Sequence, residues 1–224
     1  MRLDPILDQV CKELLAAHAV HTILLYGSRA DGSAGADSDY DVAAFGPLDK
    51  SFRVARVVNG AYLDIFVYPE TLLLEPTEEY LKLRGSLVVL QRGVEAEDFL
   101  SKLEEVFRRG PEPLPSDEIE ARKVWAHKMA ARMQRADLEG NYRRVWLLTA
   151  LLEDYFHIRG LWYQGPKKSL RWLQQFDAPT YDAIRLALEP NANEEAVFSL
   201  VHLVAGKPDA PNPSFKRTRL RRSA

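Results

Sequence analysis

Three aspartates in the first third of this 224-residue chain stand where apolar runs begin or are interrupted. Asp39 and Asp41 lie two residues apart, so on an extended strand their side chains project to one side. Asp64 interrupts the apolar run Leu63–Val67, where a charge is costly unless it binds a metal or accepts hydrogen bonds. Adjacent carboxylates repel each other unless a cation lies between them. Mg²⁺ prefers oxygen ligands, and two such ions can stabilise the attacking and leaving oxygens of an in-line displacement. Asp39, Asp41 and Asp64 are therefore candidate ligands of two Mg²⁺ ions in a phosphoryl-transfer site.

A glycine–serine turn precedes these acids. The run Ile23–Tyr26 is typical of a buried strand, and Gly27 lets the chain turn with its backbone exposed. Ser28 is a residue type that caps helices, and the free N–H groups at a helix N-terminus bind phosphate. Ser28 Oγ and the Arg29 guanidinium could donate further hydrogen bonds to the same phosphate. We therefore expect Gly27, Ser28 and Arg29 to bind a nucleoside triphosphate.

The segment Gly27–Asp41, GSRADGSAGADSDYD, together with Asp64 resembles the signature of the polymerase-beta-like nucleotidyltransferase superfamily. That signature consists of Gly-Ser, a short helix with small residues, Ser-Asp-x-Asp and a third acid on a neighbouring strand. The resemblance implies a Mg²⁺-dependent reaction in which AMP passes from ATP to a hydroxyl and pyrophosphate leaves. A small catalytic domain followed by a helical domain is most similar to the antibiotic adenylyltransferases that modify kanamycin or lincosamides, which implies a role in antibiotic resistance.

The resemblance also implies roles for residues in the second half of the chain. In kanamycin-type enzymes an acid of the helical domain is the general base, and Glu153 is the candidate nearest by position. Elsewhere in the superfamily the third strand acid removes the proton, which is Asp64 here. A solvated surface acid is the alternative interpretation of Glu153. Lys167 and Lys168 follow an aromatic–glycine segment similar to one in several small-molecule nucleotidyltransferases, which implies that they neutralise the triphosphate and the departing pyrophosphate.

Composition narrows the class of partner. The net charge of −2 lacks the excess positive charge that is typical of nucleic-acid-binding proteins. No apolar run approaches the length of a membrane span. The lone Cys11 excludes an intramolecular disulfide and fits a reducing cytoplasm. We expect a cytoplasmic protein whose partners are a nucleoside triphosphate and a small-molecule acceptor, with neither nucleic acid nor membrane. A homodimer stays open.

Residues 1–110 are expected to form the nucleotidyltransferase domain, an α+β unit in which a mixed sheet is flanked by helices. Apolar spacing predicts an amphipathic helix over Asp4–His18. Strands are predicted over His21–Tyr26 and Asp39–Phe45, followed by a hairpin around Asn59-Gly60, a strong turn signal. The two hairpin strands are expected at Arg53–Val58 and Ala61–Tyr68. A short helix is expected at Thr77–Leu83, an edge strand at Ser86–Gln91 and a longer helix at Ala96–Arg109.

A proline-rich linker, Gly110–Ser116, marks the best domain boundary. Residues 116–205 are expected to form a helical bundle that binds the acceptor. Residues 206–224 hold six basic residues against one acid and few large apolar side chains, which predicts a basic disordered tail. The bundle helices are predicted at Asp117–Asp137, Tyr142–Ile158, Ser169–Phe176, Thr180–Leu188 and Asn193–Ala205.

Transfer of AMP to an aminoglycoside- or lincosamide-like small molecule is the favoured interpretation of these patterns. Two others stay open. A protein adenylyltransferase, such as an antitoxin that modifies a helical toxin, predicts a small toxic neighbour gene. A non-catalytic nucleotide-binding scaffold predicts nucleotide binding that is indifferent to Mg²⁺.

Overall fold

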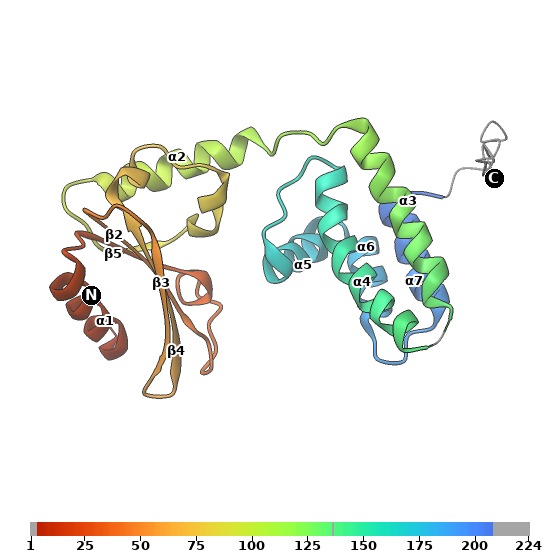
Figure 1. Cartoon of the computed structure of the whole chain (residues 1–224), viewed down its shortest axis with the longest axis horizontal. Coiled ribbons are helices and arrows are strands. Elements are labelled where there is room, and N and C mark those ends of the chain that lie inside the picture. Colours follow the sequence, from red (N-terminus) through yellow and green to blue (C-terminus); the bar gives the residue numbers. More distant parts are fainter. Residues whose placement is uncertain (1–3, 136, 208–224) are drawn as a thin grey trace, which may run out of the picture. The chain divides into compact units, whose positions relative to one another are not determined.

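The computed structural model describes residues 4–135 and 137–207. The chain divides into two compact units, Met1–Pro111 and Glu112–Ala224; the first combines a sheet with helices and the second is helical (Figure 1). The predicted α+β class, with a mixed sheet followed by a helical region, is confirmed. The tail predicted to be disordered, residues 206–224, lies outside the described residues from position 208 onward.

Five strands form one mixed sheet in the first unit, in the order β3-β4-β2-β1-β5. β2 and β4 are parallel, whereas every other neighbouring pair is antiparallel. The β3–β4 hairpin turns at Asn59 and Gly60, whose φ angles of 50° and 83° are those that a two-residue hairpin loop requires. The parallel pair thus lies inside the sheet, with a strand on either side. The strands are β1 (Thr22–Tyr26), β2 (Tyr40–Gly46), β3 (Phe52–Val58), β4 (Ala61–Pro69) and β5 (Leu87–Leu90).

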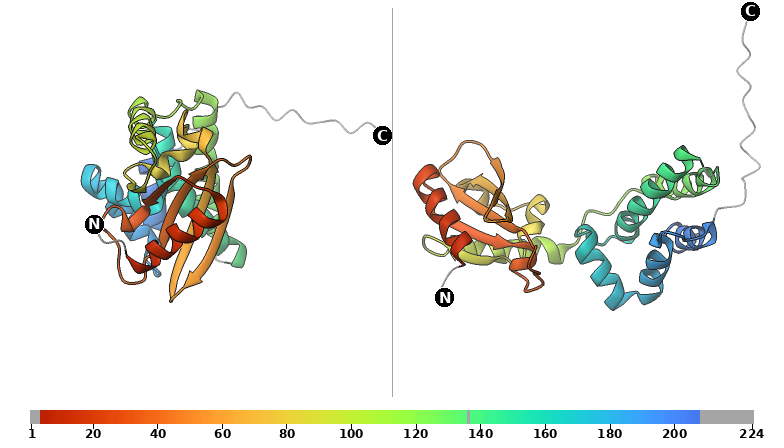
Figure 2. Two further views of the ribbon diagram at one scale, coloured as in Figure 1. Left: turned by 90° about the vertical axis from the view of Figure 1, so that its left-hand side faces the viewer. Right: turned by 90° about the horizontal axis from the view of Figure 1, so that it is seen from below.

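Helices cover both faces of this sheet, α1 (Pro5–His18) on one and α2 (Glu95–Arg109) on the other (Figure 2). Successive side chains of a strand point to opposite faces. Val42 of β2 therefore packs in the core under α1, whereas the adjacent Ala43 packs in the core that contains Phe99 of α2. The α2 side also carries two 3₁₀ helices, η2 (Glu70–Leu73) and η3 (Glu78–Leu83).

The described residues of the second unit form five helices around a core of their own. Leu147, Leu151 and Phe156 of the long helix α4 are almost fully buried in this core, together with Leu173 and Val201 from two other helices. No helix in residues 4–135 and 137–207 combines the length and apolar character needed to cross a membrane. The helices are α3 (Ser116–Met133), α4 (Leu138–Ile158), α5 (Gly165–Phe176), α6 (Ala178–Leu188) and α7 (Glu194–Ala205).

The junction between α3 and α4 differs from the prediction. α3 ends at Met133 rather than near Asp137, and α4 begins at Leu138 rather than at Tyr142. The reason is a cap: Asp137 Oδ1 accepts a hydrogen bond of 2.7 Å from the Gly140 N–H. The aspartate that was expected to end one helix therefore begins the next.

The two helices on the sheet offer a matched test of where the stability of the first unit lies. Leu103→Ala in α2 removes a fully buried side chain, and we expect it to lower the free energy of unfolding by about 2–5 kcal/mol. Leu15→Ala in α1 removes a side chain that is 44% exposed, and should cost less than about 1 kcal/mol. Hydrogen–deuterium exchange of peptides from β1 and β4 measures both costs. Equal costs would contradict the placement of Leu103 in the core.

Candidate functional site

The parallel pairing of β2 with β4 places two of the predicted acids side by side. Asp41, the second residue of β2, pairs in register with Asp64 of β4. Both carboxylates lie on the sheet face covered by α2, because Ala43 and Phe66, two residues further along their strands, pack in that core. Asp39 stands one residue before β2 and is exposed. The structure therefore brings Asp41 and Asp64 together and places Asp39 at the adjoining strand end.

The negative charge of these carboxylates contributes to raised pKa values of two nearby tyrosines. Tyr26, the last residue of β1, is the direct neighbour of Asp41 on the adjacent strand β2. Burial raises the pKa of Tyr26, and the carboxylates of Asp41 and Asp64 raise it further. Burial also raises the pKa of Tyr68 to about 12, with smaller contributions from Tyr80 and Asp64. The local potential is thus one that opposes further negative charge and attracts a cation.

Gly27 turns the chain directly after β1 with a φ of +72°, a left-handed conformation that favours glycine. A Cβ at this position would overlap Oδ2 of Asp41. Gly27 is therefore required both by the turn and by the approach of the Asp41 carboxylate to the backbone.

The turn continues as η1, a 3₁₀ helix of only Gly27–Arg29. Ser28 lies inside it, and Tyr26 holds the position that precedes the helix. The predicted capping role of Ser28 is wrong, because the short helix begins two residues earlier than a cap at Ser28 would place it. A hydrogen bond from Ser28 to phosphate stays a prediction.

Arg29 fixes the loop that carries Asp39. Its Nε and Nη2 donate hydrogen bonds of 3.1 and 2.7 Å to the carbonyl oxygen of Ser38, and Nε also reaches the carbonyl of Asp39 at 3.2 Å. The guanidinium lies over the ring of Tyr40, 3.8 Å from its centroid. Arg29 thus holds the backbone at Asp39, and its predicted contact with a triphosphate stays a prediction.

The carboxylate of Asp64 is engaged by Arg53 of β3. Arg53 Nε donates to Oδ1 at 2.6 Å and Nη2 donates to Oδ2 at 2.9 Å, a bidentate pair. The side chain of Asp64 is 16% exposed, whereas that of Arg53 is 53% exposed. These hydrogen bonds and the adjacent negative charge raise the pKa of Arg53. This partner was not predicted from the sequence, although the two-residue loop at Asn59-Gly60 sets a register that places Arg53 diagonally across from Asp64.

A second cation, Lys82 of η3, approaches the same place. Its Nζ lies 3.7 Å from the ring centroid of Phe66 and 5.8 Å from that of Tyr26. Burial of the ammonium lowers the pKa of Lys82, while the charge of Asp64 acts in the opposite direction. No local sequence signal pointed to Lys82, because its approach depends on how η3 packs on the sheet.

The donor set fits a divalent cation, although the full set is not assembled in this structure. Paired carboxylates from neighbouring strands supply the oxygen ligands that Mg²⁺ prefers. Across residues 4–135 and 137–207, no group of three or more His, Cys, Asp or Glu side chains has the arrangement of a metal-ligand set. Both oxygens of Asp64 accept hydrogen bonds from Arg53. The two-metal site of Asp39, Asp41 and Asp64 stays a prediction.

The remaining predicted residues belong to the second unit. Glu153 is exposed on α4, with a carboxylate oxygen 3.7 Å from Nδ1 of His157. The adjacent Asp154 is buried and accepts a 2.7 Å hydrogen bond from Arg122. Lys167 and Lys168 stand in the first turn of α5, the former exposed and the latter half-buried. Their predicted catalytic and nucleotide-binding roles stay predictions.

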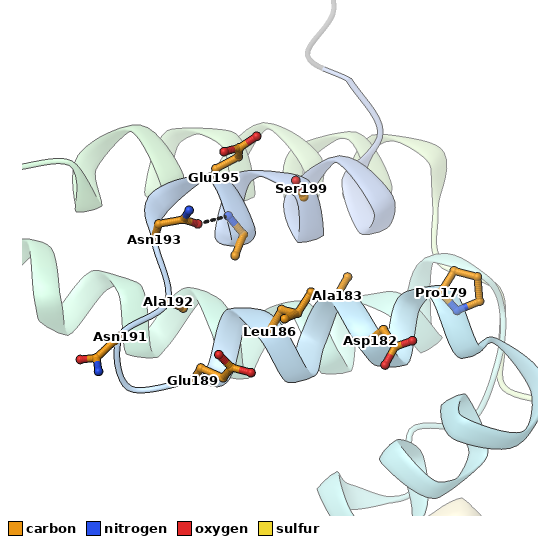
Figure 3. Close-up of a pocket in the computed structure, with 11 residues that line it drawn as sticks. Pro179, Asp182, Ala183, Leu186, Glu189, Asn191, Ala192, Asn193, Glu195 and Ser199 are labelled. Carbon is orange, nitrogen blue, oxygen red and sulfur yellow. Dashed lines mark hydrogen bonds between the residues drawn. The ribbon is translucent and has the colours of Figure 1, made fainter.

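A pocket of the second unit lies between α6 and α7 (Figure 3). Its lining includes Asp182 and Glu189, each paired with Arg185 at 3.4 Å, and Glu195. The described residues that line it include none of the predicted site residues. The pocket is therefore separate from the carboxylate cluster of the first unit.

Comparisons with known proteins add little to this geometry. No protein-family model and no curated protein matches the chain. Among solved structures, it is similar to a nucleotidyltransferase-like protein from Exiguobacterium sibiricum 255-15, with 14% identity over 89% of this chain and 75% of that one. The TM-score of 0.40 leaves the two structures too different for function to be transferred.

The closeness of Gly27 to Asp41 predicts a difference between two alanine variants. Gly32 has the same sign of φ, +76°, but an added Cβ there would meet nothing within 4 Å. We expect Gly32→Ala to cost about 1 kcal/mol of stability through backbone strain alone. Gly27→Ala should cost at least about 1 kcal/mol more, because the carboxylate of Asp41 must also shift. Hydrogen–deuterium exchange of the sheet peptides measures both variants, and equal losses would contradict the close approach.

Proposed function

We propose that this protein is a Mg²⁺-dependent nucleotidyltransferase that transfers AMP from ATP to a hydroxyl of an aminoglycoside- or lincosamide-like small molecule and releases pyrophosphate. The observation that supports this most directly is the in-register pair of Asp41 and Asp64 beside the left-handed turn at Gly27. Asp39, Asp41 and Asp64 are the residues that would hold Mg²⁺. When bound, Mg²⁺ would supply Lewis-acid stabilisation of charge on the attacking and leaving oxygens.

The chain's own residues have distinct tasks in this proposal. The Gly27 turn brings the backbone close to Asp41, so that a triphosphate and its metal-binding carboxylate would share one strand end. Ser28 contributes a hydroxyl donor at that turn. Arg29 fixes the backbone at Asp39 through the Ser38 and Asp39 carbonyls. Lys167 and Lys168 are proposed to neutralise the triphosphate and the departing pyrophosphate.

Removal of the acceptor's hydroxyl proton has two candidate bases. Asp64 lies in the carboxylate cluster, where it is engaged by Arg53. Glu153 is exposed, so its carboxylate is open to solvent, and the resemblance to kanamycin-type enzymes favours it. An acid that serves only as base leaves nucleotide binding intact when it is removed, whereas an acid that also binds metal does not.

Mg²⁺-dependent ATP binding tests the metal–nucleotide part of the proposal. We expect calorimetry to show ATP binding that is lost with chelator and is weakened at least about 100-fold in the Asp39→Asn/Asp41→Asn variant. Asp37→Asn/Asp49→Asn removes the same charge from two exposed positions of the first unit and should bind as wild type does. An ATP affinity that changes neither with chelator nor in the Asp39→Asn/Asp41→Asn variant would favour the interpretation as a non-catalytic scaffold.

Adduct mass tests the acceptor and the base. We expect kanamycin or lincomycin incubated with the protein and Mg²⁺-ATP to gain one AMP. Glu153→Gln should slow this transfer about 10²- to 10⁴-fold with ATP affinity unchanged, while Glu120→Gln, an exposed acid of α3, should not. Full activity in Glu153→Gln would assign the base to Asp64. Failure of both compounds, with ATP binding intact, would contradict the proposed acceptor class.

A further inference from the structure

Two cationic side chains, Arg53 and Lys82, lie near the same aromatic ring, that of Phe66, beside the carboxylate pair. The guanidinium carbon of Arg53 lies 5.1 Å from the ring centroid of Phe66, and the ammonium of Lys82 lies 3.7 Å from it. Phe66 follows Asp64 by two residues on β4, so the ring and the carboxylate share one face of the sheet. Arg53 and Lys82, from different elements, are thus held next to Asp64.

The hairpin register explains why Arg53 reaches Asp64. Ala55 is the direct neighbour of Asp64 on β3, and Arg53 is the neighbour of Phe66. The small side chain of Ala55 leaves the diagonal approach open, and the long arginine spans it with two hydrogen bonds. Because the Arg53 side chain is half exposed, it can leave Asp64 without disturbing the core.

Arg53 is the counter-ion of Asp64 in this structure. Asp41 and Asp64 are in-register neighbours, and Arg53 offsets one of the two charges. Its hydrogen bonds take one lone-pair site on each Asp64 oxygen and place a positive charge beside the carboxylate, so Arg53 competes with a metal ion for Asp64. A guanidinium released from a carboxylate finds an equivalent bidentate acceptor in a phosphate group. Lys82 is already placed beside the position where such a phosphate would lie, because it rests on the same ring.

We propose that Arg53 and Lys82 form a polyphosphate-binding subsite next to the carboxylate pair. Arg53 is the counter-ion of Asp64 while the site is without metal, and it moves to a phosphate oxygen of the nucleotide when Asp64 becomes a metal ligand. Lys82 binds the same polyphosphate from its position on Phe66. This inference rests on the proposed nucleotidyltransferase function.

Arg53→Gln gives effects of opposite sign on the two ligands. Without nucleotide, Mn²⁺ titrated by electron paramagnetic resonance should bind about tenfold more tightly, because the competing guanidinium is gone. Inorganic tripolyphosphate with Mg²⁺, titrated by calorimetry, should bind about tenfold more weakly, because a charge-assisted donor is lost. A purely structural role of Arg53 would not move the two affinities in opposite directions.

Matched variants separate these effects from misfolding. Arg56→Gln removes an arginine of the same strand that pairs with Glu13 of α1, under the opposite face, and should change neither affinity. Arg53→Lys keeps the charge and should return Mn²⁺ affinity close to the wild-type value. Lys82→Gln should weaken tripolyphosphate binding about tenfold with Mn²⁺ affinity changed less than about threefold. Lys50→Gln, at an exposed loop position, should change neither.

The outcomes distinguish this inference from the proposed function. Wild type that binds neither Mn²⁺ nor Mg²⁺-ATP would overturn both. Wild type that binds them, with Arg53→Gln and Lys82→Gln binding tripolyphosphate equally well, would overturn the subsite alone. A fall in Mn²⁺ affinity in Arg53→Gln would likewise contradict the role of Arg53 as a competing counter-ion.

Discussion

The parallel pairing of β2 with β4 is the constraint on which the candidate site depends. It sets Asp41 and Asp64 directly beside each other, so the sheet itself creates a concentration of like charge. Such charge must be offset by a cation or by hydrogen bonds. Arg53 meets that requirement at Asp64 through hydrogen bonds to both oxygens, while the missing side chain of Gly27 leaves room for the carboxylate of Asp41.

The compensation of this charge is asymmetric, and the asymmetry is consistent with the proposed binding of metal and phosphate. Both residues belong to paired strands, but the short side chain of Asp64 is only 16% exposed, whereas the long side chain of Arg53 is 53% exposed. An ion pair of this kind is weak evidence for stability, since exposed pairs contribute little. In the proposal the carboxylate stays in place and the more exposed guanidinium moves, as binding of metal and phosphate at this site would require.

Local pattern predicted much of the fold, and long-range contacts explain what it missed. Alternation placed Asp64 on the opposite face from Leu63 and Ile65, and both of those are buried under α1. The parallel register of β2 with β4 joins strands that are separated in the chain by the whole of β3, so no local signal could supply it. Lys82 was missed for the same reason. Arg53 could have been found, because the Asn59-Gly60 turn fixes the register of β3.

The most direct test of the central claim is anomalous diffraction from crystals of the whole chain grown with Mn²⁺ and a non-hydrolysable ATP analogue. We expect anomalous peaks roughly 2.1 Å from carboxylate oxygens of Asp41 and Asp64, with Arg53 withdrawn from Asp64 and facing the triphosphate. Crystals that contain the analogue but show no peak at these carboxylates, and in which Arg53 still holds both oxygens of Asp64, would contradict it.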